Sequence, residues 1–165
     1  MKNGNAEAFN VFGLCFAFGT HGMPRHRANA HKLFQKAGEL GCADAYCNLG
    51  IAYRQGEGVE IDIKKATHFY ELAAMSGDVC ARHRLGLMEY NAGNHQRAMK
   101  HFTVAARAGD RKCLEKLGKG FIDGHVTKNE CESALRAYNE SQTEIKNDAR
   151  DKAAAILAQR RPVRK

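Results

Sequence analysis

Apolar and small residues recur along this chain at spacings of three and four, which is the period of an α-helix. Segments with this period alternate with short stretches rich in glycine, asparagine and aspartate, where helices typically begin and end. The pattern predicts eight helices in four successive pairs. The expected first helices of the pairs lie near 5–19, 43–55, 79–92 and 111–123. The expected second helices lie near 28–40, 63–76, 95–108 and 128–158.

The same residue types recur in each pair, so the chain contains an internal repeat. In every first helix a large apolar residue precedes a glycine, and these glycines are Gly13, Gly50, Gly86 and Gly118. In every second helix an alanine is followed four residues later by an aromatic residue. These pairs are Ala30 and Phe34, Ala66 and Tyr70, Ala98 and Phe102, and Ala134 and Tyr138. We expect the glycines and alanines to let the helices approach closely and the aromatic rings to fill the space between them.

A single helical hairpin cannot bury its own apolar face, so successive hairpins are expected to stack. The predicted fold is all-α, a right-handed α-α superhelix (solenoid) of about four helix-hairpin repeats with a C-terminal capping helix. We expect a solenoid over residues 1–142 and a C-terminal helix extension with a basic tail over 143–165. Asp62 and Asn94 are predicted to cap second helices, and Thr127 with Glu130 fits a capping box.

The repeat around the second pair has a more specific signature. Fourteen of its positions share the pattern of one known repeat family: Ala45, Leu49, Gly50, Tyr53, Gly56, Gly58, Val59, Asp62, Lys65, Ala66, Tyr70, Ala73, Ala74 and Gly77. The chain therefore resembles the Sel-one-like repeat (SLR) family, relatives of the tetratricopeptide repeats. The first copy departs from the family pattern, with His26 in place of the usual aspartate.

The resemblance implies adaptor or scaffold work by a superhelix whose inner surface holds a peptide or domain. It also implies an alternative, because some members belong to protein-degradation complexes and some are joined to a RING-type zinc module. That module needs closely spaced Cys/His pairs, which this sequence lacks. A cysteine-rich subgroup carries a disulfide in each hairpin, but the cysteines here do not recur at equivalent repeat positions.

In helical solenoids the first helices of the hairpins line the concave face. The positions there that packing leaves free predict a partner-binding surface of Leu14, Asn48, Ile51, Arg84, Leu87, Lys116 and Lys119. This surface is apolar toward the N-terminus and basic toward the C-terminus, which suits an extended peptide with an apolar anchor and acidic residues. The alternative is that the apolar positions are ordinary inter-repeat core and the basic ones a solvated face.

Charge adds one feature to this picture. The chain carries a net charge of +8, and residues 146–165 hold seven basic and two acidic residues. Such a basic cluster can bind nucleic acid or direct a protein to the nucleus, whereas a solvated helix end is the simpler interpretation. Nucleic-acid binding by the whole domain is not favoured, because the basic residues are not interleaved with aromatic ones along a groove.

Six cysteines and eight histidines raise the question of catalysis or metal binding. No CxxC pair occurs, so we expect free thiols and neither a metal nor a cofactor. Cys80 and His83 lie three residues apart with Arg82 and Arg84 beside them, a setting that could lower the pKa of the thiol, yet a structural cysteine is the favoured interpretation. No window is apolar enough for a transmembrane helix, and the N-terminus does not read as a signal peptide.

These observations predict a non-enzymatic protein–protein interaction scaffold or adaptor that binds a protein or an acidic, apolar peptide on its concave face. We expect a cytoplasmic location and no membrane partner, with a nuclear location open through the tail. Three alternatives remain: the substrate- or adaptor-binding part of a ubiquitin-ligase or protein-degradation complex, a nucleic-acid-associated protein using the tail, and a thiol enzyme.

Overall fold

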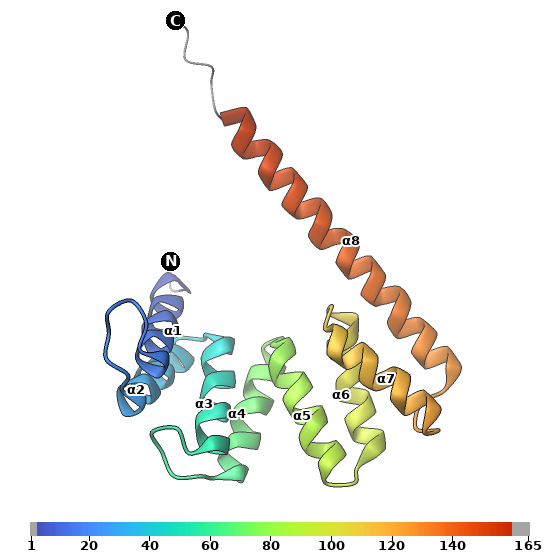
Figure 1. Cartoon of the computed structure of the whole chain (residues 1–165), viewed down its shortest axis with the longest axis horizontal. Coiled ribbons are helices and arrows are strands. Elements are labelled where there is room, and N and C mark those ends of the chain that lie inside the picture. The colour runs from blue at the N-terminus through green and yellow to red at the C-terminus, as the bar shows by residue number, and fades with distance from the viewer. Residues whose placement is uncertain (1–2, 160–165) are drawn as a thin grey trace, which may run out of the picture. The chain divides into compact units, whose positions relative to one another are not determined.

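The computed structural model describes residues 3–159, and within this range the chain forms α-helices and no strand (Figure 1). The helices are α1 (Asn3–Phe18), α2 (Arg27–Glu39), α3 (Ala43–Gln55), α4 (Ile63–Met75), α5 (Val79–Asn91), α6 (His95–Arg107), α7 (Arg111–Ile122) and α8 (Lys128–Gln159). Each predicted helix boundary lies within two residues of the observed one. The predicted all-α class is confirmed.

The helices fall into two compact units, one made by α1 to α5 and the other by α6 to α8. In the first unit each helix packs on the next one along the chain. One core cluster joins α1, α2 and α3, and its buried members are Ala30, Phe34, Ala37, Ala45 and Leu49. A second cluster joins α3, α4 and α5, and its buried members are Cys47, Ala66, Tyr70, Ala73, Ala74, Ala81 and Leu85. The prevalence of alanine explains how closely the helices of this unit approach.

An aromatic ring rests directly on a glycine backbone in each of the first two hairpins. A Cβ atom at Gly13 would lie 2.6 Å from Cε1 of Phe34, and one at Gly50 would lie 2.5 Å from Cε1 of Tyr70. These separations are far below a van der Waals contact, so any larger residue would displace the ring. The first helix of the hairpin thus needs glycine at this position so that the second helix can pack against it.

The second unit departs from this arrangement. A Cβ atom at Gly118 would meet no neighbour within 4 Å, so this glycine of the repeat does not seat a ring. Gly120, one half-turn further along α7, takes the close contact instead, with the sulfur of Met99 from α6. Tyr138, the aromatic residue expected to fill the space, is only half-buried on α8. Gly118 therefore keeps the sequence pattern of the repeat, whereas Gly120 makes the close helix–helix contact.

Side-chain caps define where several helices begin. Asp62 caps α4 as predicted, with Oδ1 accepting from the Lys65 amide at 2.9 Å. His26 takes the equivalent role at α2, where its Nδ1 accepts from the Asn29 amide at 3.1 Å. A histidine thus replaces the usual aspartate without loss of the cap.

The remaining predicted caps have different outcomes. Thr127 and Glu130 form the predicted reciprocal capping box at α8, with distances of 2.7–3.3 Å. The side-chain amide of Asn94 donates to Glu89 Oε2 at 2.7 Å, and its capping role stays a prediction.

The last helix, α8, is one continuous helix of 32 residues. Its beginning packs on α6 and α7, and Ala134 is fully buried there. From residue 143 onward its described side chains are exposed. The predicted boundary at 142 stays a prediction, and the basic cluster at 160–165 lies outside the described residues.

Two glycine-to-alanine substitutions test the seating of the rings. We expect Gly50→Ala to lower the free energy of unfolding by about 1–3 kcal/mol, because the new methyl group overlaps Tyr70. Gly118→Ala, also within a helix but facing open space, should raise it by about 0.5–1 kcal/mol through the better helix propensity of alanine. Urea denaturation of the full chain followed by circular dichroism measures both. Effects of the same sign would contradict the packing role of Gly50.

Candidate functional site

Three residues of the predicted concave surface meet at one cavity of the first unit. Leu14 comes from α1, while Asn48 and Ile51 come from α3, and all three are half-buried. The other lining residues are Ala17, Phe18, Arg27, Ala30, His31, Phe34, Ala52 and Glu57. The cavity measures about 60 Å³. Typical small-molecule sites measure about 300–1,000 Å³, so this one suits a single side chain and not a cofactor.

Two of the residues that line the cavity, Ala30 and Phe34, belong to the buried core. Phe34 is 5% exposed and seats on Gly13, and the cavity residue Leu14 follows that glycine directly along α1. Ile51 follows Gly50 in the same way along α3. Successive residues of a helix point about 100° apart, so the contact made by the glycine also fixes the direction of the residue beside it.

Asn48 joins the two helices that line the cavity. Its Nδ2 donates to Oδ1 of Asn10 on α1 at 2.9 Å, and Asn10 is 7% exposed. A side-chain hydrogen bond in such a protected place strongly prefers to stay formed, because breaking it leaves a polar group without a partner. Asn48 therefore holds α1 against α3 and has one amide group already engaged within the fold.

An ion pair lies at the cavity. Arg27, the first residue of α2, contacts Glu57 of the α3–α4 loop at 3.1 Å, with side chains 41% and 30% exposed. The loop passes close to the backbone of Arg27 at Gly58. Only glycine fits there, because its φ is +80° and the Arg27 carbonyl leaves no room for a side chain. The pair places one charge of each sign beside an apolar cavity, where a partner's polar groups can meet them.

His31 supplies the polar feature of the cavity wall. The residue is 8% exposed, and its ring packs edge-on against Tyr53 with centroids 5.3 Å apart. Its Nε2 is buried and makes no hydrogen bond within the described part of the chain. Burial lowers the pKa of His31, so the imidazole is neutral at pH 7. A buried ring nitrogen without a partner can donate to or accept from a group that enters the cavity.

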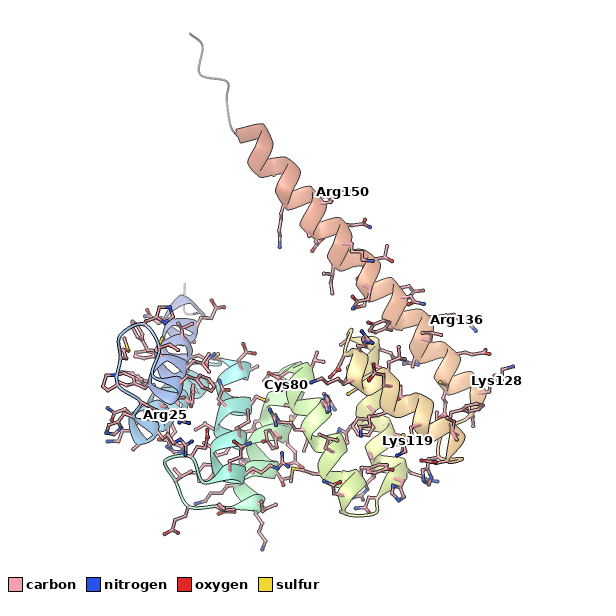
Figure 2. The ribbon with its side chains drawn as sticks, viewed as in Figure 1. Arg25, Cys80, Lys119, Lys128, Arg136 and Arg150 are labelled. Atoms are coloured by element: carbon pink, nitrogen blue, oxygen red, sulfur yellow. The ribbon has the colours of Figure 1, made fainter. Side chains whose placement is uncertain are left out.

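The basic residues of the predicted surface occupy different settings. Arg84 is half-buried on α5, with its Nε buried, and its guanidinium lies beside the thiol of Cys80. Leu87 is half-buried one turn further along the same helix. Lys116 and Lys119, the latter labelled in Figure 2, belong to α7 of the second unit. Lys119 is exposed and Lys116 is half-buried. A single groove through all seven residues stays a prediction.

Sequence reasoning did not single out Arg27, His31 or Glu57. The repeat pattern gave no clear signal for His31, because the residues that follow the repeat alanine in the other copies are Thr67, the buried Met99 and the exposed Leu135. The ion pair gave no such signal, since Arg27 and Glu57 lie 30 residues apart and in different repeats.

One cluster of the first unit has donor atoms of the types that hold metals. The sulfurs of Cys47 and Cys80 and a carboxylate oxygen of Asp78 lie within 4.8 Å of one another. Burial raises the pKa of the Asp78 carboxyl, and the positive guanidinium of Arg84 lies beside Cys80. The positive charge beside Cys80 opposes a bound dication, and only three donor atoms of the described residues gather here, so a metal centre is not favoured. The sequence-based pairing of Cys80 with His83 missed the contact between Cys80 and Cys47.

None of the described helices combines the length and apolar character that crossing a membrane requires.

Comparison with known proteins gives matches along most of the chain. The family model described as Sel1 repeat matches residues 8–42, 43–78 and 81–110. An uncharacterized protein of Neisseria meningitidis is 35% identical over 129 residues, which is 78% of this chain and 27% of that protein. The ERAD-associated E3 ubiquitin-protein ligase component HRD3B of Arabidopsis thaliana is 33% identical over 103 residues, 62% of this chain and 16% of that protein. The chain thus spans about a quarter or less of these relatives.

Two crystal structures resemble the fold. A Sel1 repeat protein from Oxalobacter formigenes superposes with a TM-score of 0.69 at 28% identity, over 84% of this chain and 58% of that one. A protective antigen of uropathogenic Escherichia coli with an SLR fold superposes with a TM-score of 0.70 at 28% identity, over 86% of this chain and 31% of that one. The likeness confirms the predicted solenoid of helical hairpins.

The buried imidazole predicts a pH-dependent stability. Because the pKa of His31 is lower in the folded than in the unfolded chain, the unfolded state takes up a proton first as pH falls below about 6.5. The contribution of His31 to stability is therefore full at pH 7.5 and declines toward pH 5.5. We expect the melting temperature to fall less over this range in His31→Phe than in the wild-type chain.

The exposed His68 provides the matched control for this measurement. His68→Phe should keep the pH dependence of the wild-type melting temperature. Identical pH profiles for the wild-type chain and His31→Phe would show that the imidazole is not desolvated.

Proposed function

Because the chain belongs to the Sel1 repeat family, whose members act as protein-interaction scaffolds, we propose that it is a non-enzymatic adaptor that binds a partner protein through the first unit. The cavity lined by Leu14, Asn48 and Ile51 is the observation that carries this proposal. It is apolar, and the polar groups around it are few and fixed. Such a site holds one anchoring side chain of a protein and leaves the rest of the segment to the surrounding surface.

The surface of α1 next to the cavity supports an apolar contact. Phe18 lines the cavity and is 68% exposed, and Val11 and Phe12 on the same helix are 55% and 49% exposed. Exposed apolar residues are ordinary when scattered, but three on one helix, one of which lines an apolar cavity, favour an interaction surface. We infer that an aliphatic side chain of the partner fills the cavity while neighbouring residues cover α1.

Polar groups would orient the bound segment. Arg27 and Glu57 offer one charge of each sign to the backbone or side-chain groups of the partner. A peptide backbone presents both a donor and an acceptor at each residue, which suits this combination. The inference favours an extended or loop segment over a flat protein surface.

The class of partner is a separate inference. The likeness to HRD3B, named as a component of an E3 ubiquitin-protein ligase, favours an adaptor role in a protein-degradation complex as a second candidate. Affinity purification of the full chain from its source cells tests it. Recovery of ubiquitin-ligase subunits that depends on Phe18 supports this role, whereas their absence from the recovered proteins excludes it.

A selection of displayed peptides against the full chain tests the cavity directly. We expect selected peptides to share an aliphatic residue, and Phe18→Asp to weaken their binding at least tenfold, about 1.4 kcal/mol. The side chain of Phe18 is largely exposed, so this substitution leaves the core intact. Met75→Asp, at an exposed apolar residue of the same unit that does not line the cavity, is the matched control and should bind like the wild-type chain. Equal binding by both variants would place the interaction elsewhere.

The basic residues of α7 make a separate prediction. If Lys116 and Lys119 attract acidic residues of the partner, Lys116→Glu/Lys119→Glu should slow association and reduce its dependence on salt. Surface plasmon resonance at 50 and 300 mM salt measures this with acidic selected peptides. Lys128→Glu/Arg136→Glu, which reverses two exposed charges on α8, controls for net charge (Figure 2). The same loss in both double variants would refute a local role for α7.

A further inference from the structure

Two cysteines from neighbouring repeats face each other in the first unit. Cys47 lies on α3 and is 4% exposed, whereas Cys80 is the second residue of α5 and is exposed (Figure 2). Their sulfur atoms lie within 4.8 Å of each other, although the residues are 33 positions apart in the chain. Cys80 is therefore the cysteine of the pair that reagents in solution reach, while the buried Cys47 lies close to it.

The surroundings make the two thiols chemically different. Cys47 donates a hydrogen bond to Cys80, and Arg84 lies one helical turn beyond Cys80 on the same face of α5. The hydrogen bond, followed by the charge of Arg84, lowers the pKa of Cys80 to about 6. The start of α5 adds a favourable dipole for an anion.

Cys47 responds in the opposite sense. Its hydrogen bond to Cys80 and then its burial raise the pKa of Cys47, and the nearby Asp78 acts in the same direction. Asp78 itself is close to Asp44 of α3, and burial keeps its carboxyl toward the neutral form. At neutral pH the pair therefore consists of an exposed thiolate at Cys80 and a protonated, buried thiol at Cys47.

We propose that Cys80 and Cys47 form a peroxide-responsive thiol pair, in which a hydroperoxide oxidises Cys80 and Cys47 then closes a disulfide between the second and third repeats. Neither cysteine lines the proposed protein-binding cavity, so the pairing can be tested separately from partner binding. The disulfide would join α3 to α5, the first helices of successive hairpins, and not the two helices of one hairpin.

The chemistry balances with one hydroperoxide. The Cys80 thiolate attacks the outer peroxide oxygen, the O–O bond breaks, and the alkoxide or hydroxide that leaves takes up a proton from water. Cys80 is now a sulfenic acid. The Cys47 sulfur attacks the Cys80 sulfur, the S–O bond breaks and the S–S bond forms. Hydroxide leaves with the proton of the Cys47 thiol as water, and the two thiols have lost two electrons to the peroxide.

Alkylation rates test the reactivity of Cys80. At pH 6 about half of a thiol with a pKa of about 6 is thiolate, against about 0.3% for an ordinary thiol with a pKa of about 8.5. Cys80 thus has a thiolate fraction about 160 times that of an ordinary thiol. Each low-pKa thiolate is, however, a weaker nucleophile by a little more than tenfold, which leaves a rate advantage of about tenfold. We expect iodoacetamide at pH 6 to label Cys80 about tenfold faster than Cys131 in the reduced full chain, Cys47→Ala to remove the larger part of the difference, and Arg84→Gln to remove a smaller part. Equal rates at Cys80 and Cys131 would overturn the proposal.

Oxidation with hydrogen peroxide tests the pairing. Peptide mapping by mass spectrometry should find Cys47 linked to Cys80 after one equivalent of oxidant, and Cys131→Ser should give the same link. In Cys47→Ser the reaction should stop at a Cys80 sulfenic acid that dimedone traps. Over-oxidation of Cys80 in the wild-type chain without a link to Cys47, or a link between other cysteines, would overturn the pairing even if Cys47→Ser fails to fold.

Discussion

The seating of an aromatic ring on a glycine backbone is the contact on which the first unit depends. Phe34 lies on Gly13 and Tyr70 lies on Gly50, closer than any other residue would permit. Tyr70 is fully buried, and the alanines around the rings are nearly so, which means that the two helices of each hairpin meet almost backbone to backbone. Close packing of this kind stabilises a unit whose core contains few large aliphatic side chains.

The same contact positions the candidate binding site. Leu14 and Ile51 each follow a ring-bearing glycine, so the rotation of α1 and α3 that seats the rings also turns these side chains toward the cavity. The hydrogen bond from Asn48 to Asn10 then fixes α1 relative to α3. The packing glycines and the cavity residues are adjacent in the sequence because the same orientation of the helix about its axis places both. A substitution at the glycine would therefore disturb binding as well as stability.

Sequence reasoning recovered the helices because their signal is local. Spacings of three and four and the caps at Asp62 and Thr127 lie within single elements, and they located the helix ends to within two residues. The exchange of packing roles between Gly118 and Gly120 was missed, because the sequence pattern of the fourth copy stays similar while Met99 enters from α6. The recurrence of a residue at the same position of each repeat does not show which repeats still make the packing contact.

The candidate sites show the same limit more sharply. Leu14, Asn48 and Ile51 were predicted from their register on the first helices, and they do meet at one cavity. Arg27, Glu57 and the Cys47–Cys80 pair were not, because each contact joins residues of different repeats whose side-chain directions the repeat pattern does not specify. Arg84 illustrates the consequence: its register predicts a place on the partner-binding surface, and the structure adds a contact with the thiol of Cys80 that the register did not indicate.

Placement of both sites on α3 gives them a physical connection. Cys47 and Ile51 are one helical turn apart on α3, and Ile51 also packs against the buried cluster that contains Cys47. A helix responds nearly as a rigid body to a restraint at one of its residues. A covalent link from α3 to α5 would thus limit how far Asn48 and Ile51 can move relative to α1. The cavity between α1 and α3 would then depend on the oxidation state of a thiol that does not line it.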